Sequence, residues 1–180
     1  TTHAVNTAFY AYLIAEKSGY AGEMITEVCV GAMMHDVGKI EPGLLDSTSL
    51  VDSTSSTSCL ESTSSSESML RLTKSHPIEG FRRLCHEPGI TEPQLLMAYQ
   101  HHEKLDGKGF PVGLIGNEIH EASRICAVAN RYDGLTSDRS DRRAMTRMAA
   151  FRVMDSEKNT ALDSEMIICL EAAMSQTSTN

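Results

Sequence analysis

Six residues of this chain are candidate metal ligands, and they come from well-separated positions. A histidine and an aspartate are adjacent at the end of an apolar segment, and two adjacent histidines precede a glycine-rich segment. Imidazole and carboxylate together suit iron, manganese, zinc or nickel better than calcium. The six are His3, His35, Asp36, His76, His101 and His102.

Taken singly, these residues also have ordinary structural explanations. A His-Asp pair commonly serves as a cap or a hydrogen-bonding pair, and the helix dipole favours cationic histidines such as His101 and His102 at a solvated C-terminus. Together in one domain they favour a centre of two or more ions, which can activate a water and neutralise a phosphodiester. Since no serine or cysteine has an obvious base beside it, we predict a metal-activated water rather than a covalent intermediate.

Helices must position these residues, because apolar residues recur at helical spacing and no alternating strand pattern appears. The segment 106–111 (DGKGFP) is dense in helix breakers and predicts a loop. The expected fold class is therefore all-α. The predicted helices cover about 3–18, 24–33, 69–85 with an interruption near Pro77, 91–103, 121–135, 144–154 and 164–173.

Length and composition fit a single folded domain, with 180 residues of which 41% are hydrophobic. Acidic residues outnumber basic ones by 24 to 16, which argues against binding to a nucleic acid polymer or to an anionic membrane surface. Five cysteines without CxxC spacing indicate reduced thiols. With no apolar run of membrane-spanning length and no visible signal peptide, a cytoplasmic protein is expected.

One stretch differs from the rest of the expected domain, which covers residues 1–175. Residues 46–68 are rich in serine and threonine and cannot bury much apolar area, so we predict a flexible surface loop. The alternative is a lid, because the stretch follows the His35-Asp36 pair. The polar composition of residues 176–180 predicts a polar tail.

Four motifs of the chain resemble the HD-GYP domain family. HDVGK at 35–39 is similar to the HD signature of the wider HD phosphohydrolase superfamily, and HHEKLDGKGFPVGLIGNEI at 101–119 resembles the stretch that defines the HD-GYP subgroup. HPIEG at 76–80 and RICAVANRYDGLTSDR at 124–139 also match family patterns. The resemblance implies an HD-domain helical bundle with a central metal site, and a phosphodiesterase that hydrolyses cyclic di-GMP to pGpG or GMP.

The resemblance also implies roles for individual residues. The six residues above and Asn130 match the family's metal ligands, which would hold two divalent ions, iron or alternatively manganese. Asp36 and Lys39 would be catalytic, with Lys39 as a general acid or phosphate clamp. Guanidinium groups are well shaped to grip phosphates. The implied substrate-binding residues are Lys39, Gly107, Gly109, Phe110, Arg139 and Arg142.

The chain departs from the family pattern at two of these positions. Phe110 replaces the tyrosine of GYP and so lacks its hydroxyl. Asn130 replaces an aspartate ligand and is neutral, while for the nearby Asp133 we expect a structural role. The implied partners are cyclic di-GMP or a related cyclic dinucleotide, and a signalling protein such as a GGDEF domain. The alternative function is a degenerate domain that binds a cyclic dinucleotide or a protein partner without turnover.

Overall fold

The computed structural model describes residues 2–39, 65–138 and 142–176, and within them it is helical. Apart from two isolated bridges, these residues form no β-structure, which confirms the all-α prediction. The elements are α1 (Thr2–Lys17), α2 (Glu23–Met34), the 3-10 turn η1 (Val37–Lys39), α3 (Ser65–Leu84), α4 (Glu92–Gln100), the 3-10 turn η2 (Gly116–Glu118), α5 (Glu121–Thr136), α6 (Arg147–Ser156) and α7 (Ser164–Gln176).

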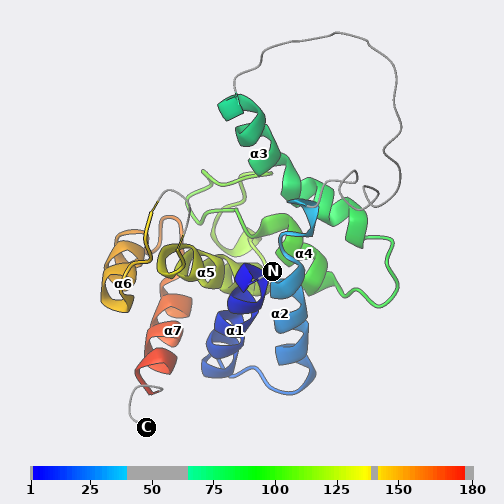
Figure 1. The fold of residues 1–180 in the computed structure, drawn as a ribbon. Coiled ribbons are helices and arrows are strands. Elements are labelled where there is room, and N and C mark those ends of the chain that lie inside the picture. Colours follow the sequence, from blue (N-terminus) through cyan, green and yellow to red (C-terminus); the bar gives the residue numbers. More distant parts are fainter. Residues whose placement is uncertain (1, 40–64, 139–141, 177–180) are drawn as a thin grey trace, which may run out of the picture.

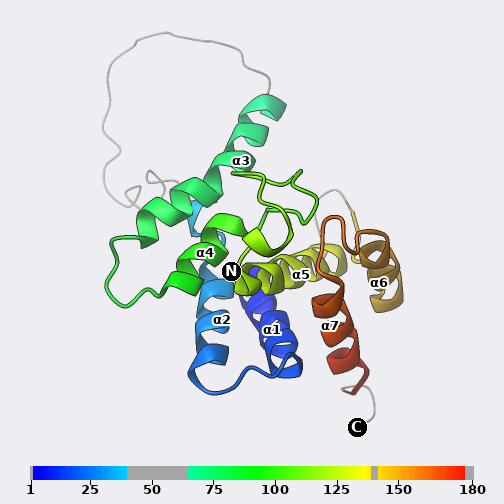
Figure 2. The same ribbon diagram turned by 180° about the vertical axis from the view of Figure 1, so that it is seen from behind.

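Helix α5 lies in the middle of the bundle, and α1, α4, α6 and α7 all pack against it (Figure 1). On one side α1 contacts both α2 and α7, and on the other α4 contacts α2 and α3. The view from behind also places the beginning of α1 at the centre of the molecule (Figure 2). Consequently the first turn of α1 lies where α2 and α4 end, and residues from three helix ends can meet there.

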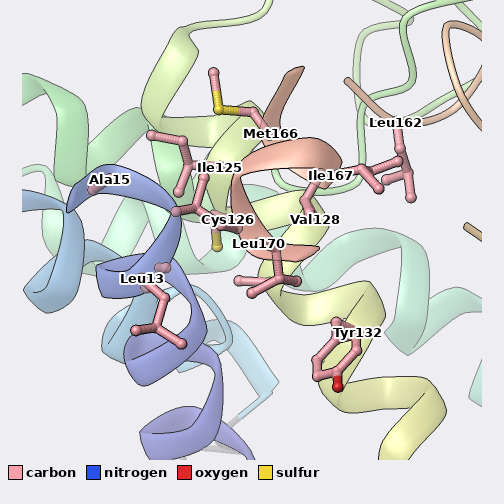
Figure 3. Packing of buried hydrophobic residues seen from close by; sticks show 14 of the residues in the cluster. Leu13, Ala15, Ile125, Cys126, Val128, Tyr132, Leu162, Met166, Ile167 and Leu170 are labelled. Atoms are coloured by element: carbon pink, nitrogen blue, oxygen red, sulfur yellow. The ribbon is translucent and has the colours of Figure 1, made fainter. Parts of the chain in front are cut away.

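The hydrophobic core lies between α1, α5 and α7 (Figure 3). Ile14 on α1, Ile125 on α5 and Ile167 on α7 are fully buried. Each helix presents an apolar stripe at i, i+3 and i+4 spacing, which burial against its neighbours stabilises. The core therefore fixes α5 against α1, and it thereby fixes the side chains that α5 sends towards the start of α1.

Three differences from the predicted helices have a clear physical reason. Helix α3 continues through Pro77 without a break, because the buried proline lies where the helix packs on η1 and α4, and this packing compensates for one lost backbone hydrogen bond. Helix α4 ends at Gln100, three residues early, since Glu103 turns back into the following loop. Helix α6 begins at Arg147, because Thr146 caps it by accepting the N–H of Ala149.

The predicted loop at 46–68 is described only at its end. Helix α3 begins at Ser65, so the last four residues of that stretch are helical, and the others lie outside the described residues. The predicted tail likewise lies outside them except for Gln176, the last residue of α7. No helix in the described ranges is both long enough and apolar enough to span a bilayer.

Candidate metal centre

The structure brings six of the seven predicted ligands, the five histidines and Asp36, together at the centre of the bundle. They form two overlapping groups, in each of which the candidate ligand atoms lie within 4.8 Å of one another. We name them the four-residue group and the three-residue group. The first contains Asp36, His76, His101 and His102, and the second contains His3, His35 and Asp36.

Asp36 is the residue common to both groups, and its two carboxylate oxygens face different sides. Oδ1 lies 3.2 Å from Nε2 of His76 and 3.6 Å from Nε2 of His101. Oδ2 lies 3.4 Å from Nε2 of His35 and 3.7 Å from Nε2 of His3. A carboxylate placed in this way could bridge two neighbouring ions.

A close backbone contact sets the distance between the HDVGK and HPIEG motifs. Gly38 in η1 lies so near α3 that a Cβ added to it would stand 2.0 Å from the carbonyl oxygen of His76 and 2.6 Å from the backbone nitrogen of Gly80. Only glycine fits at such a separation. The contact places Asp36, two residues earlier, beside the His76 ring.

Backbone carbonyls orient two of the histidines. The Nδ1 of His35 lies 2.7 Å from the carbonyl oxygen of Ala32, and the Nδ1 of His101 lies 3.0 Å from that of Met97. A carbonyl can only accept, so each Nδ1 carries the hydrogen and each Nε2 presents a lone pair. This arrangement is usual for metal-binding histidines.

Three buried polar atoms at this site lack hydrogen-bond partners, which indicates that the site suits a cation. Nε2 of His35, Oδ1 of Asp36 and Nε2 of His102 are buried and have no hydrogen-bond partner. Buried polar atoms are normally paired, so each such atom needs an explanation, and a bound ion supplies one here. The donor set of five imidazoles and one carboxylate fits divalent ions such as iron, manganese, zinc or nickel.

The pKa values in this site favour the protonation states that metal binding needs. Burial alone would raise the pKa of Asp36, but the close imidazoles of His101, His35 and His76 outweigh burial and hold that pKa well below its usual range. Burial lowers the pKa of His101 to about 4. Burial, reinforced by charge on His101 and His76, lowers the pKa of His102 to about 2. The carboxylate is thus charged and these two imidazoles neutral at pH 7.

The predicted catalytic residue Lys39 lies beside this carboxylate. Its Nζ is 2.7 Å from Oδ2 of Asp36, and the lysine side chain is 49% exposed. The ammonium group therefore stands at the boundary between the buried histidines and solvent.

Asp133, for which a structural role was expected, holds one of the candidate ligands. Its Oδ2 lies 2.5 Å from Nδ1 of His3, while Oδ1 accepts hydrogen bonds from Asn6 and Ser137. Asp133 is 1% exposed, so the α5 carboxylate is fixed behind the first turn of α1. The sequence pattern alone did not assign it this contact.

Other predicted residues lie around a cavity of about 470 Å³ beside the four-residue group. Asn130 lines its wall together with His101 and His102. Arg142 lines it too, and its guanidinium donates to the carbonyl oxygens of Gly134 and Leu135 at the end of α5. Arg139, the other predicted phosphate ligand, lies outside the described residues.

The loop at 106–111 folds back onto the histidines. Gly107 has a φ of +75°, and a Cβ on Gly109 would stand 2.3 Å from the backbone nitrogen of Lys104, so both positions require glycine. Phe110 stacks on the ring of His102. The loop is thus part of the wall around the candidate ligands.

Glu103 anchors this loop, and sequence reasoning missed it. Its buried carboxylate accepts the backbone N–H groups of Val112, Gly113 and Leu114 at 2.7–3.1 Å. The signal for it was present in the sequence, since an acidic residue directly after two candidate ligands and before a glycine-rich turn is suited to bind the turn's amides.

Comparisons with known proteins agree with this fold. The HD domain family model matches residues 11–166. The chain is 29% identical over 174 residues to the 3'3'-cGAMP-specific phosphodiesterase 3 of Vibrio cholerae, with 96% of this chain and 35% of the relative covered. It is 30% identical over 161 residues to the cyclic di-GMP phosphodiesterase response regulator RpfG of Xanthomonas campestris, with 89% and 39% covered.

A solved structure gives the same fold. A Bdellovibrio bacteriovorus protein described as HDG"Y"P superposes with a TM-score of 0.71 at 21% identity, covering 96% of this chain and 51% of that one. The chain spans under two fifths of the length of the two curated relatives. Helical fold, clustered histidines and the extent of the family match together define an HD-type protein. This chain belongs to the HD domain family.

Proposed function

We propose that this chain is a metal-dependent phosphodiesterase that hydrolyses a cyclic dinucleotide, with cyclic di-GMP as the substrate to test first and pGpG and GMP as products. The observation that carries the proposal is the Asp36 carboxylate, which faces three imidazoles of one group and two of the other within a buried site. Two adjacent sites for divalent ions are the arrangement that phosphodiester hydrolysis uses.

The proposal assigns the two groups to two divalent ions, iron or alternatively manganese. Ions bound there would acidify a water for attack on phosphorus and neutralise the phosphodiester. The protein's own part is to keep His101 and His102 neutral and Asp36 charged, which the directions of their pKa shifts favour. Asn130, on the cavity wall beside these histidines, would add a neutral oxygen donor.

Lys39 has the position needed for a proton donor or a phosphate clamp. Attack by water breaks the bond between phosphorus and the ribose 3′ oxygen, and the departing oxygen takes up a proton. The Lys39 ammonium, half-exposed and bound to Asp36, stands where it can contact the phosphate or supply that proton.

The cavity beside the four-residue group is the proposed binding place for the rest of the substrate. At about 470 Å³ it is within the range of small-molecule sites. Lys104, Arg131 and Arg142 line it and would place positive charge near bound phosphates, although Arg131 is paired with Glu157. Arg139, Gly107 and Gly109 remain proposed contacts by resemblance. The two curated relatives support the substrate class, because both are named as phosphodiesterases of cyclic dinucleotides.

A second candidate function is binding of a cyclic dinucleotide without turnover. Two observations favour it: Asn130 offers no charge to a metal ion, and Phe110 has no hydroxyl and stacks on His102. Under this reading the protein acts through a partner, such as a GGDEF domain. For both candidate functions we propose a cytoplasmic location. We also propose that residues 1–175 form one domain. Within it, the Ser/Thr-rich stretch would be a loop or a lid.

Product analysis separates the two candidates. Protein loaded anaerobically with Fe²⁺ or with Mn²⁺ is incubated separately with cyclic di-GMP, 3'3'-cGAMP and cyclic di-AMP, and products are resolved by chromatography. The proposal predicts linear dinucleotide from at least one substrate, with none from Asp36→Asn. His86→Ala, which changes an exposed histidine outside both groups, is the matched control and should retain activity. Saturable binding without product from any substrate would establish the second candidate instead.

A further inference from the structure

The two groups at the metal centre differ in ligand number and in burial. The four-residue group offers three imidazoles and a carboxylate, and His76 and His101 in it are both 2% exposed. The three-residue group offers two imidazoles and the shared carboxylate. One of those imidazoles, His3, has a side chain that is 34% exposed. Among the described residues, an ion in the three-residue group would therefore have fewer ligands, and its binding would depend more strongly on how His3 is held.

His3 is held in a different way from His35 and His101. Those two point Nδ1 at carbonyls of their own helices, so the helix backbone fixes them. His3 lies in the first described turn of α1, and the contact of its Nδ1 is with another helix. Its Nδ1 contacts the side chain of Asp133 on α5 at 2.5 Å, across 130 residues of sequence.

Asp133 is itself fixed by further contacts. Asn6 donates to Oδ1 at 2.7 Å and Ser137 donates to it at 2.8 Å, which leaves Oδ2 for His3. Because the carboxylate is almost fully buried, it has little freedom to turn away from these donors. Asp133 thus sets both the tautomer and the direction of the His3 ring: Nδ1 carries the hydrogen, and Nε2 faces Asp36.

From these contacts we propose that Asp133 is a positioning residue that governs binding of the second metal ion, the one in the three-residue group. It acts through His3 and touches no candidate ligand atom of the four-residue group in the described contacts. The proposal rests on the metal centre proposed above, but it does not depend on which nucleotide is hydrolysed or on whether hydrolysis occurs.

The decisive change is Asp133→Asn. An amide can turn its NH₂ towards Nδ1, and His3 then carries its hydrogen on Nε2 and has no lone pair for an ion. Loss of an outer carboxylate partner lowers metal affinity by roughly 10–100-fold. The first ion should bind as in the wild type, because the four-residue group is unchanged.

The test is calorimetric titration of metal-free protein with Mn²⁺, together with metal content measured after gel filtration. Wild type should bind two ions in two steps, and Asp133→Asn should lose affinity only in the weaker step. Asp163→Asn is the matched control, since Asp163 is a buried carboxylate that binds Arg124 and caps α7 away from the site. It should lower stability and leave both binding steps unchanged.

A double-mutant cycle with His3→Ala distinguishes positioning from general damage. If Asp133 acts through His3, Asp133→Asn should weaken the second step no further once His3 is alanine. Equal weakening of both steps, unchanged binding, or a full additional loss in the His3→Ala background would overturn the proposal. Asn6→Ala removes one hydrogen-bond donor to Asp133 and should weaken the second binding step by a smaller factor than Asp133→Asn does. This variant replaces Asp133→Asn in the test if Asp133→Asn does not fold.

Discussion

The ring of Phe110 lies almost parallel to the ring of His102, with centroids 4.6 Å apart and planes 18° apart. The residue that replaces the family's tyrosine thus covers one face of a candidate metal ligand. An aromatic stack of this kind holds the imidazole orientation as well as burying it. The loop around Phe110 is therefore a structural part of the proposed metal centre.

Replacing Phe110 by alanine should loosen His102. We expect a loss of about 1–3 kcal/mol in the free energy of unfolding, since the ring is partly buried and stacked, and weaker binding of the first metal ion. Phe110→Tyr keeps the stack and should bind metal normally. Val112→Ala, at an exposed position of the same loop, should change stability by less than about 0.5 kcal/mol. Unchanged metal affinity in Phe110→Ala would refute this role.

Because of the contact between η1 and α3, we expect two glycine substitutions to have opposite effects on stability. Gly38→Ala would force η1 away from His76 and Gly80, so we expect a destabilised protein with little bound metal. In Gly80→Ala the new Cβ would have its nearest neighbour at 3.4 Å, an ordinary contact. Alanine there should stabilise α3 by about 0.5–1 kcal/mol. Thermal unfolding and metal analysis of both variants check this, and equal stability of the two would contradict it.

Glu103→Gln tests the anchor formed with the backbone of Val112, Gly113 and Leu114. The amide cannot accept from all three backbone N–H groups that the carboxylate binds, so we expect a loss of about 1–3 kcal/mol in unfolding free energy. Glu118→Gln, at an exposed carboxylate with a single amide contact to Ile115, is the control and should have a smaller effect. Chemical denaturation measures both, and a larger loss in the control would argue against the anchor.

The low pKa values of His101 and His102 predict an acid-sensitive metal-free protein. In the unfolded chain both titrate near 6.5, whereas in the fold their pKa values are about 4 and about 2. Below pH 6.5 the unfolded state therefore binds more protons, and stability falls as pH drops towards 4, and further towards 2 for His102.

Urea unfolding of metal-free protein at pH 7.5, 6 and 5 measures this dependence. His101→Gln should flatten it, while His86→Gln, at an exposed position, should leave it unchanged. Stability that stays constant or rises between pH 7.5 and pH 5 would show that these histidines are protonated in the fold.

The helices and the identity of the clustered histidines could be predicted from the sequence, because helical periodicity and the His/Asp motifs are local signals. The partners of these residues could not. The contact of His3 with Asp133 joins residues 130 positions apart, and it depends on how α5 packs against α1. The continuity of α3 through Pro77 likewise depends on packing against η1 and α4, which outweighs a local helix-breaking signal.

Asn130→Asp tests what the neutral residue contributes. A carboxylate on the cavity wall beside His101 and His102 should raise metal affinity, and it should raise turnover if weak metal loading limits the protein. Asn117→Asp, at an exposed position, is the control for added charge alone. Lower metal affinity in Asn130→Asp than in the wild type would exclude a direct contact with the ions.

The most direct test of the central claim is hydrolysis of cyclic di-GMP before and after removal of metal. Protein loaded with Fe²⁺ or Mn²⁺ should form pGpG, a chelator should abolish product formation, and addition of the same metal should restore it. No linear dinucleotide from the fully loaded protein with cyclic di-GMP or either of the other two cyclic dinucleotides, or equal product from loaded and chelated protein, would contradict the account.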